Sequence, residues 1–198
     1  MKRSPTLLIY LLLAALVASG VLWMVGDRMA GSARSVSTGT ATIGGPFSLI
    51  DQNGKRVTNA DYSGRTMVIY FGYTHCPDIC PVTLSVIAEA LSKLGDDEKR
   101  IVPIFVTVDP ERDTPQILKA YLAAFGPHFV GLTGNAQEIG LIKKEYHVYS
   151  EKQPMPGGDY AVNHSNTIYV MGPDGSFVDN FDETLGPDKM AERLRKDL

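Results

Sequence analysis

Cysteine, histidine and tryptophan, which often take part in binding, are scarce in this chain. Its 198 residues include two cysteines, four histidines and one tryptophan, and no run of basic residues occurs. The formal net charge is −3. Proteins that bind nucleic acid usually concentrate positive charge on one face, so this composition argues against a nucleic-acid partner. With 44% apolar residues, 21% charged residues and no internal repeat, the chain is predicted to hold one globular domain plus an additional segment.

Charged residues are also absent from a long segment near the start. None occurs between residues 5 and 26, and residues 7–13 are continuously apolar. A helix of about 20 apolar residues spans the roughly 30 Å hydrocarbon core of a bilayer. Residues 1–28 therefore predict a cytoplasmic start followed by a single transmembrane helix. Lys2 and Arg3 are expected to stay cytoplasmic, which places the rest of the chain outside the membrane.

The alternative interpretation of this segment is a cleaved signal peptide. Small residues at 18–20 resemble a cleavage region, but apolar sequence resumes at residues 21–25, which favours an uncleaved anchor. Gly, Ser, Thr and Ala then dominate, so residues 29–44 are predicted to form a flexible linker to a domain at residues 45–198. The short basic start, without an Arg/Ser-rich transit segment, favours a bacterial inner membrane with the domain facing the periplasm.

Cys76 and Cys80 lie four positions apart, where the sequence changes from strand-like to helix-like. Residues 67–71 form a short apolar run, and apolar residues recur at helical spacing over residues 82–94. If Cys76 precedes the first helical turn and Cys80 lies within it, both sulfurs point to one side. The positive N-terminal end of a helix also favours thiolate over thiol. The spacing therefore predicts a reactive thiol pair on a turn between a strand and a helix.

Such a thiol pair has three uses: a structural disulfide, disulfide exchange with a partner, or binding of a soft metal ion. Thiols outside the cytoplasmic membrane tend to oxidise, which suits a disulfide. A bridge that closes so short a loop adds little stability, because the stabilisation grows with loop length. A purely structural disulfide is therefore the weakest of the three interpretations. The cysteines alone do not choose between exchange and metal binding.

The remaining pattern predicts an α/β domain. Further strands and helices are expected, in chain order, at residues 47–50, 56–58, 101–108, 115–125 (helix), 135–146 (helix), 167–171, 177–181 and 187–198 (helix). Strand–helix units indicate a parallel part of the sheet, and the hairpins indicate an antiparallel edge. This order, with the cysteines after the first core strand, resembles the thioredoxin fold, here with an N-terminal β-hairpin.

His164 differs from the other histidines in its position. It lies in the loop before the predicted strand at residues 167–171, and in a thioredoxin-like arrangement that loop faces the cysteine turn. The ordinary oxidoreductases of that fold place a cis-proline there, whereas this loop contains no proline. Beside two thiolates, an imidazole at this place supplies a third metal ligand. Met155, in a Pro/Gly-rich loop, is a candidate auxiliary ligand, and His75 is a candidate to tune the site.

The three candidate donors limit the choice of metal. Two thiolates and one imidazole suit Cu(I) or Zn(II) and disfavour Mg²⁺ or Ca²⁺. Structural zinc usually takes four protein ligands, and a fourth is not evident in the sequence. The set of Cys76, Cys80 and His164 therefore fits three-coordinate Cu(I), with a position open for transfer or for a further donor to Cu(II).

An acidic loop follows the predicted strand at residues 101–108 and has two interpretations. Asp109 and Asp113 either act electrostatically at the cysteine site or contact a partner, or they end the strand and cap the next helix. Capping by Asp113 or Thr114 is the preferred interpretation. Asp78, between the cysteines, is predicted to face solvent and to support the helix N-terminus.

Three segments of this sequence resemble the Sco (SenC) family. They are YFGYTHCPDICP at residues 70–81, VTVDPERDTP at residues 106–115 and DYAVNHSNTIYVMGPDG at residues 159–175. That family comprises membrane-anchored, thioredoxin-fold copper proteins that help to assemble the CuA centre of cytochrome c oxidase subunit II. The resemblance runs from about Gly44 onward and assigns the family's copper ligands to Cys76, Cys80 and His164. One departure is Asn163, because the residue before the histidine is often aspartate.

The resemblance implies a metallochaperone, which passes copper to the CuA domain by ligand exchange and breaks no substrate bond. A second function stays open. As a thiol–disulfide oxidoreductase, the chain would reduce the CuA-site cysteines of the same partner, with Cys76 as the attacking thiol. Other periplasmic copper carriers and thiol–disulfide proteins are further candidate partners. A peroxide-reducing enzyme of the same fold ranks below both.

Overall fold

The computed structural model describes residues 19–20, 43–196 and 198. The predicted anchor at residues 1–28 lies outside the described residues apart from Ser19 and Gly20, as does the predicted linker apart from residues 43 and 44. Among the described residues, none of the helices has the length and apolar character needed to cross a bilayer.

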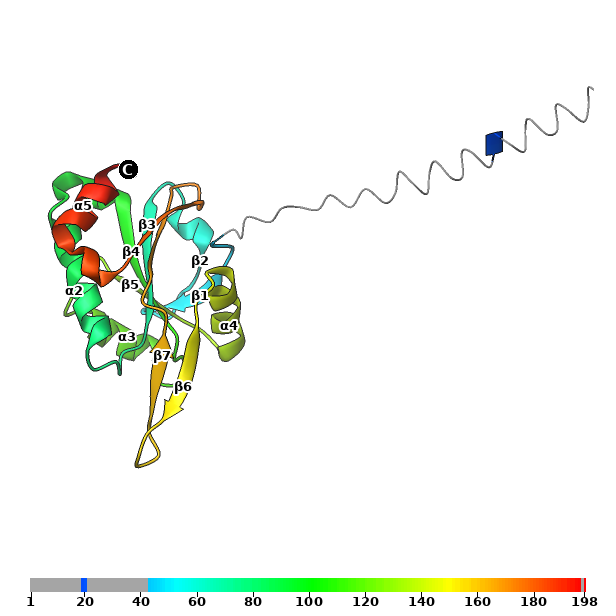
Figure 1. Cartoon of the computed structure of the whole chain (residues 1–198), viewed down its shortest axis with the longest axis vertical. Helices are drawn as coiled ribbons and strands as arrows, with labels where there is room; N and C mark the ends of the chain where they lie inside the picture. Colours follow the sequence, from blue (N-terminus) through cyan, green and yellow to red (C-terminus); the bar gives the residue numbers. More distant parts are fainter. Residues whose placement is uncertain (1–18, 21–42, 197) are drawn as a thin grey trace, which may run out of the picture. The chain divides into compact units, whose positions relative to one another are not determined.

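From residue 43 onward, the chain forms a seven-stranded sheet with helices on both faces (Figure 1). Its strand order is β2-β1-β5-β4-β3-β8-β9. The strands are β1 (Ser48–Asp51), β2 (Arg56–Thr58), β3 (Thr66–Gly72), β4 (Ile101–Thr107), β5 (Val130–Thr133), β8 (Ile168–Met171) and β9 (Phe177–Phe181). The helices are α2 (Ile79–Ser92), α3 (Pro115–Leu122), α4 (Ala136–Glu145) and α5 (Pro187–Lys196). Three short 3-10 helices lie at Asn59–Tyr62, Gly95–Arg100 and Glu183–Leu185.

The centre of the sheet is parallel and both sides are antiparallel. β3 pairs with β4 and β4 with β5 in parallel, whereas β8 and β9 on one side and β1 and β2 on the other run antiparallel. The predicted N-terminal hairpin is therefore confirmed as β1–β2. The α/β, thioredoxin-like prediction is also confirmed, with one addition. Antiparallel strands lie at both edges and not at one.

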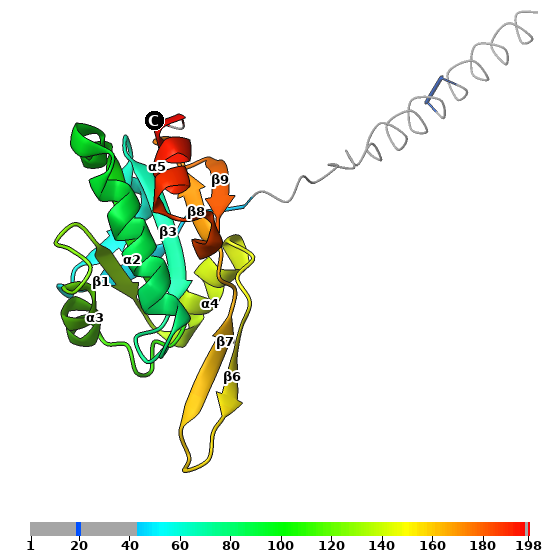
Figure 2. The same cartoon turned by 60° about the vertical axis from the view of Figure 1, so that its left-hand side comes forward.

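The central strands owe their place to continuous apolar sequence. Every residue of β3 and of β4 is buried, as expected for strands covered on both faces. Helices α2, α3 and α5 cover one face and α4 covers the other (Figure 1 and Figure 2). Phe71 of β3 packs against Tyr146 at the end of α4, with ring centroids 5.4 Å apart. Its neighbour Tyr70 points to the opposite face and packs against Phe105 of β4, with centroids 6.2 Å apart.

Two features were not predicted. One is the short strand β5, which extends the parallel part of the sheet. The other is a separate hairpin, β6 (Ser150–Pro154) and β7 (Tyr160–His164), which projects from the domain in both views (Figure 1 and Figure 2). The sequence predicts only loops there because β6 reads SEKQP and has no buried residue. Strand prediction depends on apolar alternation, which a solvent-exposed hairpin does not need.

Candidate metal centre

Cys76 and Cys80 lie on the turn that joins β3 to α2, as the spacing predicted. Cys76 precedes the helix and is partly exposed, whereas Cys80 is the second residue of α2 and is fully buried. The backbone N–H of Cys80 donates to the sulfur of Cys76 at 3.4 Å. A free N–H group of the first helical turn therefore points at the more exposed sulfur, where it favours the thiolate.

His164 is the last residue of β7 and brings the third donor to the two sulfurs. Its Nε2 lies 3.4 Å from the sulfur of Cys80. The ligand atoms of Cys76, Cys80 and His164 all lie within 4.8 Å of one another. Among the described residues, no other group of three or more His, Cys, Asp or Glu side chains converges in this way.

The hydrogen bond on the other ring nitrogen fixes which tautomer of His164 is present. Nδ1 lies 2.8 Å from the carbonyl oxygen of Ser165. A carbonyl only accepts hydrogen bonds, so Nδ1 carries the proton and the lone pair of Nε2 is directed toward the sulfurs. A backbone carbonyl that orients the far side of the ring is the usual support for a metal-binding histidine. The imidazole is thus prepared as a ligand.

The two thiols differ in acidity. The hydrogen bond from Cys80 contributes most to lowering the pKa of Cys76, to about 3, and hydrogen bonds from backbone N–H groups add to it against the opposing effect of burial. The neighbouring sulfur of Cys76 and burial raise the pKa of Cys80. In the metal-free protein at neutral pH, Cys76 is therefore the thiolate and Cys80 the thiol.

The buried sulfur of Cys80 occupies a space that a glycine leaves open. A Cβ atom on Gly72 would lie 2.8 Å from the Cys80 sulfur and 2.8 Å from a ring carbon of Phe105. The hydroxyl of Tyr70 lies 3.6 Å from the same sulfur and donates to Asn166 Oδ1 at 2.8 Å. Nothing in the sequence patterns identified Gly72 or Tyr70 as part of the site, because their role depends on which side chains meet across β3 and α2.

Two aromatic rings hold the imidazole of His164. The ring of Tyr73, in the cysteine turn, meets it edge-on at a centroid distance of 5.8 Å and an angle of 90°. The ring of Tyr70 lies 6.2 Å away on a different side, at 66°. Asn163, the departure from the family pattern, is exposed and has no part in these contacts. The structure therefore places the change from aspartate at the surface beside the site and not among the three donors.

The structure does not bring Met155 to the site. Met155 lies in the turn between β6 and β7 and is 50% exposed. His164 pairs with Ser150 at the opposite end of that hairpin. At about 3.3 Å per residue, the four residue steps between these ends separate them by roughly 13 Å. The proposal of an auxiliary thioether ligand is therefore wrong for this conformation.

The acidic loop confirms the predicted cap at Thr114 but not the one at Asp113. Thr114 caps α3, because its side chain accepts from the N–H of Ile117 at 3.3 Å, and Asp113 does not cap the helix. Asp113 and Asp109 are instead fully buried. Asp78 is exposed at the start of α2, as predicted, and its side chain makes no capping hydrogen bond there.

The donor set fits copper on chemical grounds. Two sulfurs and one imidazole nitrogen are soft ligands, and three of them suit Cu(I). Cys80 is enclosed by protein, whereas Cys76 is partly exposed. The site is therefore open to a partner on the side of Cys76. The arrangement also allows the two sulfurs to approach each other for disulfide chemistry.

The chain is similar to a known protein family and to curated proteins. A protein-family model described as SCO1/SenC matches residues 35–198. The chain is 42% identical over 163 residues to protein SCO1 homolog 1, mitochondrial, of Arabidopsis thaliana, covering 82% of this chain and 49% of that protein. The chain thus spans about half the length of this curated relative.

Solved structures of similar proteins share the fold. The structure of Bradyrhizobium japonicum ScoI with copper bound is 47% identical, with a TM-score of 0.74, and the match covers 79% of this chain and 99% of that one. BsSco, in which a disulfide switch was identified, is a member of the Sco family of cytochrome c oxidase assembly proteins. It is 25% identical, with a TM-score of 0.62 over 78% of this chain and 92% of its own. The family match, the shared fold and the three converging donors show that the chain belongs to the SCO1/SenC family.

Proposed function

We propose that this protein is a metallochaperone that binds one copper ion through Cys76, Cys80 and His164. The observation that carries the proposal is the convergence of three soft donors within 4.8 Å, with the Nε2 lone pair of His164 directed at the sulfurs. The similarity to a ScoI structure that holds copper supports the same metal. The copper is cargo, and its recipient is the CuA domain of cytochrome c oxidase subunit II. Membership of a family of oxidase assembly proteins supports that recipient.

Transfer proceeds by ligand exchange at the open side of the site. Cys76 lies before α2 and has the more exposed sulfur, whereas Cys80 lies in the first turn of α2 and is buried. An incoming sulfur or nitrogen donor of the partner therefore displaces Cys76 first and the buried Cys80 last. No bond other than those to the metal is made or broken.

The test uses the reduced, full-length chain under anaerobic conditions with Cu(I). We expect one copper per chain. His164→Ala should weaken Cu(I) binding by more than about 100-fold, the upper range for losing a group that merely supports a ligand. The double variant Cys76→Ser/Cys80→Ser should bind none. His128→Ala is the matched control, because that imidazole is exposed and its nearest acidic partner, Glu98, lies 3.9 Å away. Equal affinity of wild type and the two ligand variants would refute the site.

The proposal extends to the position of the domain in the cell. Residues 1–28 anchor the chain in a bacterial inner membrane, residues 29–44 tether it, and residues 45–198 face the periplasm. The uncharged apolar sequence between residues 5 and 26 supports the anchor. Fractionation and protease treatment of spheroplasts test this placement. Recovery of the full-length chain in the soluble fraction, or its protection from external protease, would contradict it.

The thiol chemistry supports a second candidate function, reduction of the CuA-site cysteines of the same partner. The observation that favours it is the difference between Cys76, whose pKa is lowered, and Cys80, whose pKa is raised. The Cys76 thiolate attacks a partner disulfide, forms a mixed disulfide and releases one partner thiolate. Cys80 then gives its proton to the released partner thiolate and, as a thiolate, attacks the Cys76 sulfur, which releases the second partner thiolate. The partner gains two electrons, and Cys76 and Cys80 end as a disulfide.

His164 separates the two functions, because copper binding needs its nitrogen and disulfide exchange does not. We expect His164→Ala to retain exchange with a partner disulfide but to lose copper delivery to the CuA domain. Maturation of the partner that survives in His164→Ala would favour the reductase function instead.

A further inference from the structure

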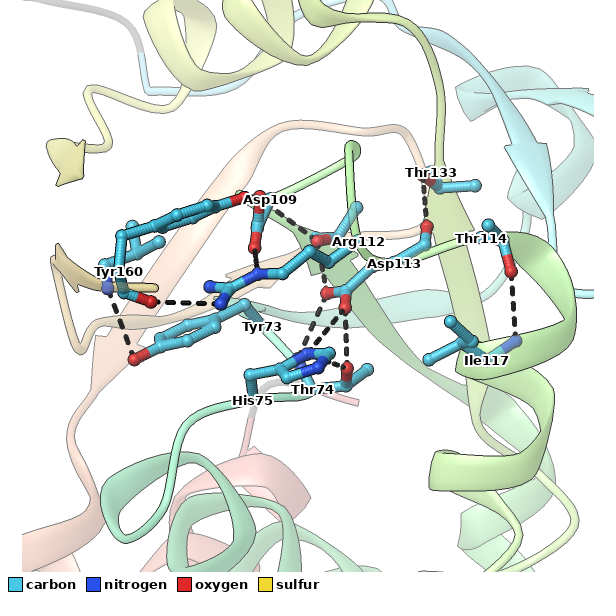
Figure 3. Close-up of polar contacts among 12 residues, drawn as sticks. Tyr73, Thr74, His75, Asp109, Arg112, Asp113, Thr114, Ile117, Thr133 and Tyr160 are labelled. Carbon is cyan, nitrogen blue, oxygen red and sulfur yellow. Dashed lines mark hydrogen bonds and ion pairs between the residues drawn. The ribbon is translucent and has the colours of Figure 1, made fainter. Parts of the chain in front are cut away.

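The turn between β4 and α3 contacts both halves of the copper site. In this turn, residues 109–113, the side chain of Arg112 reaches Tyr160 of β7 and that of Asp113 reaches Thr74 of the cysteine turn (Figure 3). Arg112 and Asp113 are adjacent in sequence, yet their side chains bind different elements. Neither residue touches the ligand atoms. Both residues can act only through the ligands, so their role rests on the proposed copper site.

Asp113 binds the cysteine turn. Its buried carboxylate accepts from the hydroxyl of Thr74 at 2.6 Å and from the N–H of Thr74 at 3.0 Å. It also accepts from the hydroxyl of Thr107, at the end of β4, at 2.6 Å. Three donors satisfy a charge that would otherwise be costly to bury. Thr74 precedes Cys76 by two residues, so the carboxylate ties the approach to Cys76 to the end of a core strand.

Arg112 binds the hairpin. Its Nη1 donates to the carbonyl oxygen of Tyr160 and to the carboxylate of Asp159, both at 3.0 Å. The guanidinium carbon lies 3.8 Å from the centroid of the Tyr160 ring. The Nε of Arg112 pairs with Asp109, which also accepts from the hydroxyl of Tyr160 at 2.8 Å. The first residue of β7 is thus held on three sides by the turn.

A second link on the opposite hairpin strand repeats this attachment. Lys152 of β6 forms an ion pair with Glu111 at 2.6 Å and lies 4.4 Å from the ring centroid of Tyr160. Tyr73 of the cysteine turn closes the arrangement, because its hydroxyl accepts from the N–H of Val162 in β7 at 3.3 Å. The turn at residues 109–113, the β6–β7 hairpin and the cysteine turn are therefore joined to one another.

The hairpin needs such an attachment. Within the part of the chain that the structure describes, β6 and β7 pair only with each other and with no strand of the main sheet. His164 is 84 positions from Cys80 in sequence, and its distance from the sulfurs depends on how the hairpin is held. A metal site needs its ligands preorganised by their supporting groups.

We propose that Arg112 and Asp113 are positioning residues for the two halves of the copper site. Arg112 sets the place of His164 by fixing the start of β7, and Asp113 sets the place of Cys76 by fixing Thr74. One turn of five residues thereby sets the distance between the imidazole and the sulfurs.

The test is a thermodynamic cycle with Cu(I) on the full-length reduced chain. Arg112→Lys keeps a positive charge beside Asp109 but loses the planar fork that reaches Asp159 and Tyr160. In the wild-type background, Arg112→Lys should weaken Cu(I) binding about tenfold, which is within the range for losing a group that supports a metal ligand. It should also reduce the copper–nitrogen signal in X-ray absorption. In the His164→Ala background it should leave the affinity unchanged, because the imidazole through which it acts is gone. Asp113→Asn should weaken binding in both backgrounds, because it acts through the cysteine turn.

Arg193→Lys is the matched control. Arg193 also pairs with an aspartate, Asp179, and also lies over an aromatic ring, Phe181 at 4.7 Å, but on α5 and β9. It should not change Cu(I) affinity in either background.

An equal loss of affinity for Arg112→Lys with and without His164 would show general destabilisation and would overturn the positioning role. An unchanged affinity and an unchanged copper–nitrogen signal in Arg112→Lys would overturn it as well. If His164→Ala itself binds Cu(I) as tightly as wild type, the proposed ligand set fails, whatever Arg112 does.

Discussion

The cysteine turn and the β6–β7 hairpin supply the same site by different means. The cysteine turn follows β3, whose residues are all buried, and Cys80 in the first turn of α2 is fully buried. The hairpin lies outside the main sheet, and Val162 is its one buried side chain. Apolar packing therefore holds the sulfur of Cys80, whereas hydrogen bonds, ion pairs and an arginine–tyrosine stack hold the hairpin that carries the imidazole.

The two halves of the site differ in the rigidity of their support. Packed cores have low compressibility, so the sulfur of Cys80 has little room to move. Elements with few buried apolar contacts open more easily than core strands. The imidazole, carried by the hairpin, therefore has a less rigid support than the sulfur of Cys80.

Removing the buried carboxylate should do the greatest damage. Asp113→Ala leaves three donors, two on Thr74 and one on Thr107, without their partner in a buried place. Each unsatisfied group costs about 1–3 kcal/mol, so we expect the free energy of unfolding to fall by at least about 3 kcal/mol. Denaturant unfolding measures the loss. Asp96→Ala is the control, because that side chain is 98% exposed, and a similar loss in both variants would contradict the prediction.

Adding one methyl group should disturb the sulfur side of the site. Gly72→Ala puts a Cβ 2.8 Å from the Cys80 sulfur and 2.8 Å from Phe105. Overpacking of this kind costs about 1–3 kcal/mol of stability, and the displaced sulfur should also bind Cu(I) more weakly. Gly54→Ala is a control for the loss of a glycine without a steric conflict, because no atom lies within 4 Å of its Cβ position. Its positive φ of 82° means that it should lose stability but keep its copper affinity.

Removing one hydroxyl should loosen the hairpin alone. Tyr73→Phe keeps the ring beside His164 but removes the acceptor for the N–H of Val162. We expect a loss of about 1 kcal/mol, seen as faster amide hydrogen exchange in β7 with unchanged exchange in β3. Tyr149→Phe is the control, since that side chain is exposed. Equal acceleration in both strands would mean that the two regions are not held independently.

The smallest expected effect is the pH dependence of alkylation of the metal-free, reduced protein. The lowered pKa of Cys76, about 3, keeps it a thiolate across pH 6–8, so its rate with iodoacetamide should change less than twofold. An ordinary thiol with a pKa of about 8.5 would react roughly 75-fold faster at pH 8 than at pH 6. Mass analysis should find the label on Cys76 and not on buried Cys80. A steep rise with pH would show that Cys76 is not a thiolate at neutral pH.

The local sequence was sufficient to predict the cysteine half of the site. The apolar run of β3, the helical spacing of α2 and the four-residue interval placed Cys76 before the helix and Cys80 within it, as observed. His164 was predicted to face the sulfurs from the fold, and it does. The strand that carries it was not predicted, because the sequence of β6 and β7 has almost no apolar alternation.

The polar supports were beyond the reach of sequence patterns. An aspartate before a threonine and a proline has the appearance of a helix cap, and only the structure shows that Thr114 caps while Asp113 is buried under the cysteine turn. In the same way, an arginine in an acidic loop has the appearance of a surface ion pair. Its stacking on Tyr160 depends on a residue 48 positions away.

Local periodicity and side-chain chemistry predicted most of the secondary structure of the core, the position of the cysteine pair between strand and helix, and the preference of thiolates and an imidazole for a soft metal. The tertiary structure decided which tautomer His164 presents, which sulfur is buried and which polar residues hold the hairpin. The physical reason is that these properties arise between segments distant in the chain, where burial and hydrogen-bond partners are set by packing and leave no periodic trace in the sequence.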